Sequence, residues 1–374
     1  MKKMFFCAAA AAVVFASCSK ENVVDAPALN NNGEETVEAI SFQMGSSFEV
    51  TTRGTGAVGG NTTETNKWNG QKLNVYMFDQ ASLDLAYNQT TSANYFENAE
   101  VTAPVGVNSG EATYGNAQYY PSTGNFDFFA YHGDDAVTEV PALNDAKDAY
   151  TVAVTIDGTQ DLMVAKAGLN KQDTTTFEAD TRGHDYKRVY SAYSARRGVQ
   201  PRFTFKHLLS RFVFQAEAAE EGAAGVDGIK ITKIEVKAPV KGEMTVAALN
   251  KENLGVTFGT EAADSAVLAL TNRGAAMTVE TLVFGKKVVL GESMLLPAGG
   301  KEYVADIYYE QDKDGQTIKD IYTTTIKLSD GSAFVAGTQY KINIKVYDFK
   351  KIVLTADLTP WVDGEEVEAD AEKE

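Results

Sequence analysis

The stretch that most constrains the fold of this chain is an alternating segment at residues 37–53, VEAISFQMGSSFEVTTR. Its apolar residues fall at even positions, between small or polar residues; they are Ile40, Phe42, Met44, Phe48 and Val50. A period of two places these side chains on one face of an extended strand. Such a strand must lie in a protein core, because alone it would expose a hydrophobic stripe to water.

The alternating segment runs into a small, polar and glycine-rich loop, TTRGTG at residues 51–56, which holds a single arginine. Exposed loops of this kind are preferred sites of proteolytic cutting. A core strand joined to the body of a protein by a cleavable loop is unusual in an ordinary domain. The combination predicts that residues 40–50 form a strand that is removed.

The first residues have the features of a bacterial lipoprotein signal. Residues 1–17 combine a positive start at Lys2 and Lys3 with an apolar run that is too short to span a bilayer. Small residues then precede Cys18, which resembles a lipobox, so Cys18 is the predicted lipidated residue. An ordinary secretory signal cut near the same point is the alternative. Residues 19–36 are polar and are predicted to form a flexible tether.

Charge and cysteine content exclude several functional classes. The formal net charge of −17 argues against a nucleic-acid partner, because phosphate binding needs a basic patch. Both cysteines, Cys7 and Cys18, lie in or next to the leader. The mature body is therefore predicted to hold no disulfide, no thiol nucleophile and no cysteine metal site. We expect no cofactor and no metal.

The rest of the chain reads as strands separated by turns, without a helical heptad run. Residues 73–78 (LNVYMF) are apolar on both faces and predict a central strand. The whole pattern predicts an all-β, mostly antiparallel protein with two β-sandwiches in series. Residues 168–200 read as a polar surface connection and place the domain boundary near residue 200. The predicted domains are residues 54–200 and 201–361, followed by an acidic tail at 362–374.

Two stretches near the C-terminus alternate most regularly. The apolar positions of the first are Tyr340, Ile342, Ile344 and Val346, and those of the second are Ile352, Leu354, Ala356 and Leu358. Both patterns predict strands with one apolar face. The close spacing of the two stretches predicts a hairpin.

Two sequence motifs suggest ligand binding, but both have simpler structural explanations. GTGAVG at residues 54–59 matches a dinucleotide-binding pattern, but no helix pattern follows it, so a loop is favoured. Glu310, Asp312 and Asp314 resemble the start of a calcium loop. Its twelfth position is Ile321 where a glutamate is needed, so a turn is favoured there.

Catalytic groups are not indicated by the sequence. His184 and Asp185 could be imagined as parts of a triad, but no nucleophile elbow accompanies them. His207 lies between apolar residues and is predicted to be a hydrogen-bonded packing residue. We therefore predict no catalytic residues and no enzymatic activity.

Several segments together resemble one family of known proteins. They are YP and FDFFAY within residues 120–131, DLMVA at 161–165, FKHLLSRF at 205–212, FVAGTQY at 334–340 and LTPW at 358–361. In this order, and with the lipobox and the TTR loop, they resemble the fimbrillins, the type V pilins of Bacteroidales, especially their Mfa-like branch. The resemblance spans nearly the whole chain.

The resemblance implies two transthyretin-like β-sandwich domains and a lipoprotein precursor that is carried to the outer membrane. It also implies an arginine-specific protease, which on this sequence would cut between Arg53 and Gly54 and release residues 18–53. The emptied groove would be refilled by a strand from another subunit. The implied donor is the hairpin of residues 340–346 and 352–358. Because such a head-to-tail contact does not close, it would build a filament.

Two functions from different classes follow from these features. The first is a structural subunit of a fimbria that supports adhesion and has other copies of itself or other fimbrial subunits as partners. The alternative is a surface lipoprotein of the outer membrane, a fimbrial anchor or tip adhesin, which binds glycan or protein without polymerising. The charged residues after Cys18 resemble the export signal of Bacteroidetes surface lipoproteins, so both readings predict a cell-surface location.

Overall fold

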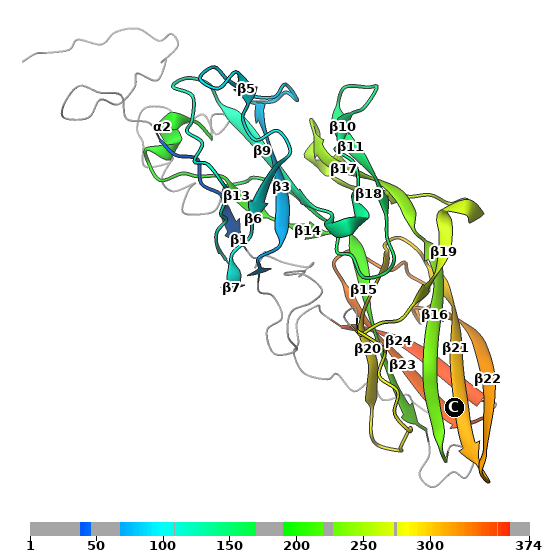
Figure 1. The fold of residues 1–374 in the computed structure, drawn as a ribbon. Helices are drawn as coiled ribbons and strands as arrows, with labels where there is room; N and C mark the ends of the chain where they lie inside the picture. Colours follow the sequence, from blue (N-terminus) through cyan, green and yellow to red (C-terminus); the bar gives the residue numbers. More distant parts are fainter. Residues whose placement is uncertain are drawn as a thin grey trace, which may run out of the picture. The chain divides into compact units, whose positions relative to one another are not determined.

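The computed structural model describes residues 38–45, 68–107, 109–169, 190–219, 227–272, 275–349 and 351–359. These residues belong to one compact unit, Val37–Glu374. Strands dominate them, and the prediction of an all-β protein is confirmed (Figure 1). Within these ranges no helix is long and apolar enough to cross a membrane. The short helices are η1 (Asp134–Ala136), α2 (Ala192–Ala195), η2 (Lys251–Asn253) and η3 (Ala262–Asp264).

A five-stranded sheet with the order β14-β12-β9-β3-β6 forms the centre of the first half of the chain. Its strands are β14 (Lys206–His207), β12 (Met163–Lys166), β9 (Phe126–His132), β3 (Lys72–Asp79) and β6 (Ala99–Thr102). Leu73, Val75 and Met77 of β3 belong to one core, whereas Tyr76 and Phe78 belong to another. Both faces of β3 are therefore covered, as its uninterrupted apolar sequence predicts.

The core on the first of these faces is completed by a three-stranded sheet of order β13-β1-β8. Its strands are β13 (Arg202–Thr204), β1 (Gln43–Gly45) and β8 (Gly110–Glu111). Two small ribbons accompany it, β2 (Trp68–Asn69) with β7 (Val105–Val107) and β4 (Tyr87–Asn88) with β5 (Ala93–Asn94). The strand β1 covers three residues of the predicted strand at residues 40–50, of which residues 46–50 lie outside the described ranges.

A four-stranded sheet of order β10-β11-β17-β18 joins segments that are far apart in the sequence. Its strands are β10 (Ala142–Leu143), β11 (Ala149–Thr155), β17 (Lys241–Ala248) and β18 (Gly255–Phe258). The pairing of β11 with β17 crosses the predicted domain boundary at residue 200. That boundary stays a prediction, and the backbone is hydrogen-bonded across it.

Two further four-stranded sheets form a sandwich in the second half of the chain (Figure 1). The first has the order β20-β15-β23-β24, with β20 (Val288–Pro297), β15 (Leu209–Ala218), β23 (Gln339–Asp348) and β24 (Lys351–Thr359). The second has the order β19-β16-β21-β22, with β19 (Ser265–Ala269), β16 (Ile229–Pro239), β21 (Glu302–Lys313) and β22 (Gln316–Lys327). Most pairs are antiparallel as predicted, but β15 and β23 run parallel.

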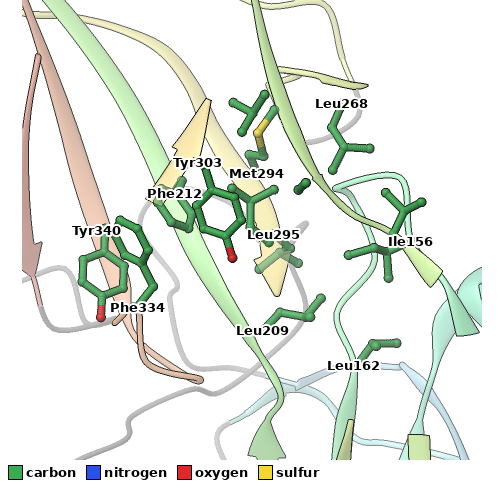
Figure 2. Close-up of a cluster of buried hydrophobic side chains, with 14 of the residues drawn as sticks. Ile156, Leu162, Leu209, Phe212, Leu268, Met294, Leu295, Tyr303, Phe334 and Tyr340 are labelled. Carbon is green, nitrogen blue, oxygen red and sulfur yellow. The ribbon is translucent and has the colours of Figure 1, made fainter. Parts of the chain in front are cut away.

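An aromatic cluster fills one end of this sandwich (Figure 2). The ring of Phe212 lies 4.9 Å from that of Phe334, 5.6 Å from that of Tyr340 and 5.8 Å from that of Tyr303, between ring centroids. The Tyr340 hydroxyl accepts a hydrogen bond from the Val335 N–H at 2.9 Å. The polar end of this buried tyrosine is thus satisfied, as a packed core requires.

The stretch that resembles a calcium loop lies at the end of β21 and in the turn that leads to β22. Asp314 and Gly315 have φ angles of 53° and 76°, a left-handed pair that favours a tight hairpin turn. The Asp312 carboxylate accepts from Lys230 Nζ at 2.8 Å and from the Thr317 hydroxyl at 2.6 Å. The prediction of a turn is therefore confirmed, and this carboxylate is engaged by protein groups.

The end of the predicted surface connection, residues 190–200, is instead part of the first core. Tyr190, Ala192, Ala195 and Val199 are buried there, so the prediction was wrong for these residues. Ala192 and Ala195 lie on the short helix α2, and Tyr190 and Val199 flank it. So short an element has no extended apolar period in the sequence, which is why these buried residues were not predicted. Residues 170–189 lie outside the described ranges.

Candidate functional site: the groove that holds the first strand

The segment around β1 is hydrogen-bonded along both edges by chain that is distant in sequence. On one edge the Ile40 N–H donates to the Gln118 carbonyl at 2.8 Å, and the Phe42 carbonyl accepts from the Ala112 N–H at 2.9 Å. On the other edge the Gln43 N–H donates to the Pro201 carbonyl at 2.9 Å, and β1 continues parallel to β13. Figure 1 shows β1 in dark blue beside the green β13. The segment therefore fills a slot between two backbone edges.

The apolar face of this segment is fully buried. Ile40, Phe42 and Met44 are 1%, 0% and 0% exposed. Four aromatic rings surround Phe42, with centroid distances of 4.8 to 5.8 Å; they belong to Phe96, Tyr114, Phe128 and Phe203. Each buried side chain of this size contributes about 1.5–3 kcal/mol. An empty groove would expose these rings and leave backbone groups unpaired on both rims, which is costly.

Two polar side chains also form hydrogen bonds with the backbone of the segment. The Gln200 amide donates to the Ala39 carbonyl at 3.0 Å and accepts from the Ser41 N–H at 3.3 Å. The Tyr114 hydroxyl donates to the Ile40 carbonyl. These contacts bind main-chain atoms, so they do not depend on which side chains the strand carries.

The remaining residues predicted for processing lie outside the described ranges. They are the lipidation site Cys18, the cleavage pair Arg53 and Gly54, and the two later strand positions Phe48 and Val50. Their roles stay predictions, as does the removal of Ile40, Phe42 and Met44. The structure adds that these last three are the apolar filling of the groove.

The predicted donor hairpin consists of two strands with different surroundings. Tyr340, Ile342, Ile344 and Val346 of β23 are buried, and β23 lies between β15 and β24. The strand β24 is at the edge of its sheet, with Ile352 buried and Leu354 and Ala356 half-buried. Leu358 belongs to β24 and pairs with Tyr340 through the backbone. An edge strand loses one ladder when it leaves, whereas β23 would lose two.

Sequence reasoning missed the lining of the groove. Nothing in the sequence around Phe96, Tyr114 and Phe203 distinguishes them from ordinary core residues. Gln200 lies at the end of residues 168–200, which were predicted to be a surface connection. No alternating or helical pattern around it indicated a role for its side chain. Only the pairing of residues about 160 positions apart in the chain brings Gln200 to the strand.

No constellation in the described part of the chain suggests catalysis or metal binding. Within it, no group of three or more potential metal ligands is found. The His207 ring nitrogen Nδ1 lies 2.8 Å from the Asp161 carboxylate, and both side chains are buried. The prediction of a hydrogen-bonded packing histidine is confirmed. His184 and Asp185 lie outside the described ranges.

Two tyrosines at the groove are expected to make the stability of the protein sensitive to alkaline pH. Burial raises the pKa of Tyr114, and burial raises the pKa of Tyr120 well above its usual range. A raised folded-state pKa contributes stability below the unfolded pKa of about 10, and this contribution is lost as the pH rises through the folded pKa. We expect urea unfolding to show a falling free energy of unfolding above about pH 10. The Tyr114→Phe variant should lose less between pH 9 and pH 11, and an equal loss would contradict this assignment.

Comparison with known proteins yields one family match. The family model described as fimbrillin-like matches residues 55–361. Among curated proteins, none matches the sequence.

The solved structures to which this chain is similar include three from Bacteroides, Parabacteroides and Porphyromonas. A candidate cell adhesion protein of Bacteroides uniformis is 16% identical, with 89% of this chain and 100% of that chain covered and a TM-score of 0.45. A candidate cell adhesion protein of Parabacteroides distasonis is 11% identical, with 88% and 99% covered and a TM-score of 0.46. The fimbrial anchor protein Mfa2 of Porphyromonas gingivalis is 11% identical, with 86% and 98% covered and a TM-score of 0.35.

Proposed function

The chain belongs to the fimbrillin-like family, and on that basis we propose that it is a structural subunit of a type V fimbria. In this proposal Cys18 carries the lipid of an outer-membrane precursor, and an arginine-specific protease cuts between Arg53 and Gly54. The segment around β1 then leaves, and a strand of another subunit takes its place. The subunit acts by assembly and needs neither a cofactor nor a catalytic group.

The observation that carries the proposal is the position of β1 in the middle of its sheet. A strand bonded on both edges and buried on its apolar face leaves a complete strand-shaped site when it departs. Because the neighbouring edges come from β8 and β13, they remain in the chain after a cut near residue 53. Precursor and polymer both have a filled groove, whereas the cut monomer does not. This difference drives strand addition from a partner.

The edge position of β24 supports it as the donor. Its apolar positions alternate over Ile352, Leu354, Ala356 and Leu358, which suits a groove that holds alternate side chains. Release of β24 alone leaves β23 paired with β15. We therefore place the exchange on β24 and treat β23 as the strand that stays.

A second function is favoured by one specific observation. The whole C-terminal hairpin is folded into its own sandwich, and the Tyr309 hydroxyl donates to the Phe349 carbonyl at 2.7 Å at the hairpin's turn. A hairpin fixed in this way suits a fimbrial anchor or tip adhesin, which receives a strand or binds a partner without donating one. Such a subunit would keep its lipid and stay at the cell surface.

Limited trypsin treatment of the full chain tests both functions. We would use a Cys18→Ala background, which carries no lipid, and follow N-terminal sequencing with unheated gel electrophoresis. The fimbrial subunit predicts a new N-terminus at Gly54 and a ladder of heat-sensitive oligomers. Arg53→Gln should prevent both, while Arg196→Gln, a matched change elsewhere, should prevent neither. A cut at Arg53 without oligomers, or no cut there, would contradict the role as a polymerising fimbrial subunit and favour the anchor or adhesin.

A further inference from the structure

The centre of the groove that holds the first strand is built from aromatic rings. Four rings surround the Phe42 side chain, and they belong to Phe96, Tyr114, Phe128 and Phe203. We refer to these four residues as the ring site. All of them follow the predicted cleavage site in the chain, so they remain when the segment around β1 leaves. A strand that takes its place must put one of its side chains among these rings.

Two contacts in the ring site have a geometry that requires an aromatic occupant. The planes of the Phe96 and Phe128 rings stand at 77° and 70° to the plane of Phe42, with centroids 4.8 and 5.6 Å away. Edge-to-face pairs of this kind stabilise beyond the area that they bury, because the positive edge of one ring meets the negative face of the other. A leucine in this place would lose both pairs and leave space between rigid rings.

The backbone of Phe96 is strained in a way that the strand's own ring offsets. Its φ of 36° lies in the left-handed region, which is costly for a bulky residue. Such a conformation persists only where the surrounding contacts hold it. The Phe96 carbonyl accepts from the Met77 N–H at 3.1 Å, and its ring packs against those of Phe42 and Tyr114. An aromatic side chain in the strand is therefore one of the few groups that hold Phe96 in place.

The candidate donor strand of this chain, β24, has no aromatic side chain to offer. Its apolar row is aliphatic throughout and consists of Ile352, Leu354, Ala356 and Leu358. If this row fills the three sites of Ile40, Phe42 and Met44, the ring site receives Leu354 or Ala356. The next aromatic residue, Trp361, falls at an odd position, so an unbroken strand would turn it to the opposite face. The groove and the donor strand of the same chain are therefore poorly matched at the centre.

We propose that the ring site selects an incoming strand with phenylalanine at its centre and an apolar side chain two residues away on either side. The hydrogen bonds of Gln200 and Tyr114 go to main-chain groups that every extended strand carries, so the choice among strands rests on the side chains. The preferred partner is then a subunit of a different kind, and β24 of a second copy is a weaker occupant. This inference rests on the proposed function, in which a strand enters the groove.

Amide hydrogen exchange in the uncut full chain tests the ring site. The reporter is the Ala112 N–H, which donates to the Phe42 carbonyl at 2.9 Å and is freed when the strand leaves the groove. Phe42→Leu, which imitates the centre of β24, should raise its exchange rate about tenfold or more. Met44→Leu, a near-isosteric change at the next site, is the matched control and should raise it about threefold or less. Equal rises would overturn the proposal, and unchanged exchange in β16 and β21 shows that the chain is folded.

A second variant makes this test specific to the rings. Phe96→Leu removes the nearest edge-to-face partner of Phe42, so a leucine at position 42 then has less to lose. In the Phe96→Leu background, the effect of Phe42→Leu on the exchange rate of Ala112 should be at least about threefold smaller. The same effect in both backgrounds would show that Phe42 is held by burial alone, and selection by the rings would be overturned.

Peptide capture tests the same preference for an incoming strand. The full chain in the Cys18→Ala background is treated with trypsin in the presence of excess peptide, and the bound peptide is identified by native mass spectrometry. A peptide of residues 37–47 should be captured about tenfold or more over its version with leucine in place of Phe42, and over a peptide of residues 352–359. Equal capture of all three would overturn the proposal. If none is captured, the proposed function fails, while the exchange result on the uncut chain still decides whether the ring site favours phenylalanine.

Discussion

Replacing Phe42 with alanine is expected to lower the free energy of unfolding by about 3–5 kcal/mol. The ring is fully buried and lies among four other aromatic rings. Its loss removes apolar contacts and leaves a cavity that these rigid rings cannot readily fill. Urea unfolding followed by tryptophan fluorescence measures the effect, because Trp68 belongs to the same core. The same variant should bind its own first strand less tightly and be cut faster by trypsin.

The matched control for this variant is Phe284→Ala. The Phe284 side chain is 49% exposed, so its removal should change the free energy of unfolding by less than about 0.5 kcal/mol. Similar losses for the two variants would show that Phe42 does not anchor the strand, and the groove would lose its main support as an assembly site.

Replacing His207 with leucine is expected to cost about 3–5 kcal/mol, for a different reason. The His207 and Asp161 side chains are 0% and 2% exposed and meet at 2.8 Å, just before β15 begins. Leucine fills the space of the ring but leaves the Asp161 carboxylate buried without this donor. Such a loss falls where the chain passes from the first half into the second, so we expect both halves to unfold at lower urea.

Asp161→Asn provides the comparison for the buried pair. It keeps an oxygen that accepts from the imidazole and removes the charge, so it should cost about 1 kcal/mol, the scale of one altered hydrogen bond. If Asp161→Asn cost as much as His207→Leu, the charge itself would be the stabilising element. Equally small effects of both changes would contradict the role of the pair.

The strand content of the fold could be predicted from the sequence because period-two patterns depend on local residues alone. The two strands β23 and β24 were predicted in this way, and the turn at Asp314 was predicted from its own loop residues. Pairing partners were not accessible. Nothing in the residues of β11 indicates β17 as its neighbour, since any exposed edge with suitable faces satisfies the same pattern. The parallel pair of β15 and β23 was missed for the same reason.

The candidate site likewise has features that follow from local sequence patterns and features that depend on tertiary position. The burial of Ile40, Phe42 and Met44 follows from their alternation. Gln200 and Tyr114 bind the same segment through side-chain hydrogen bonds, which depend on tertiary position and leave no periodic trace in the sequence. Processing residues such as Cys18 and Arg53 were inferred from local composition and from family resemblance, and they stay predictions.

The parallel pairing of β15 with β23 has a mechanical consequence. The two strands are matched over eight residue pairs, from Arg211 with Gln339 to Ala218 with Val346. A chain pulled from Leu209 and from Asp348 would load these strands at opposite ends, so their hydrogen bonds would be strained together in shear rather than broken one after another. If β24 is handed to a neighbouring subunit, tension along a filament enters and leaves this sandwich near those two residues. Tensile force on the subunit would then be borne by the β15–β23 pair in shear, in which all its hydrogen bonds resist together.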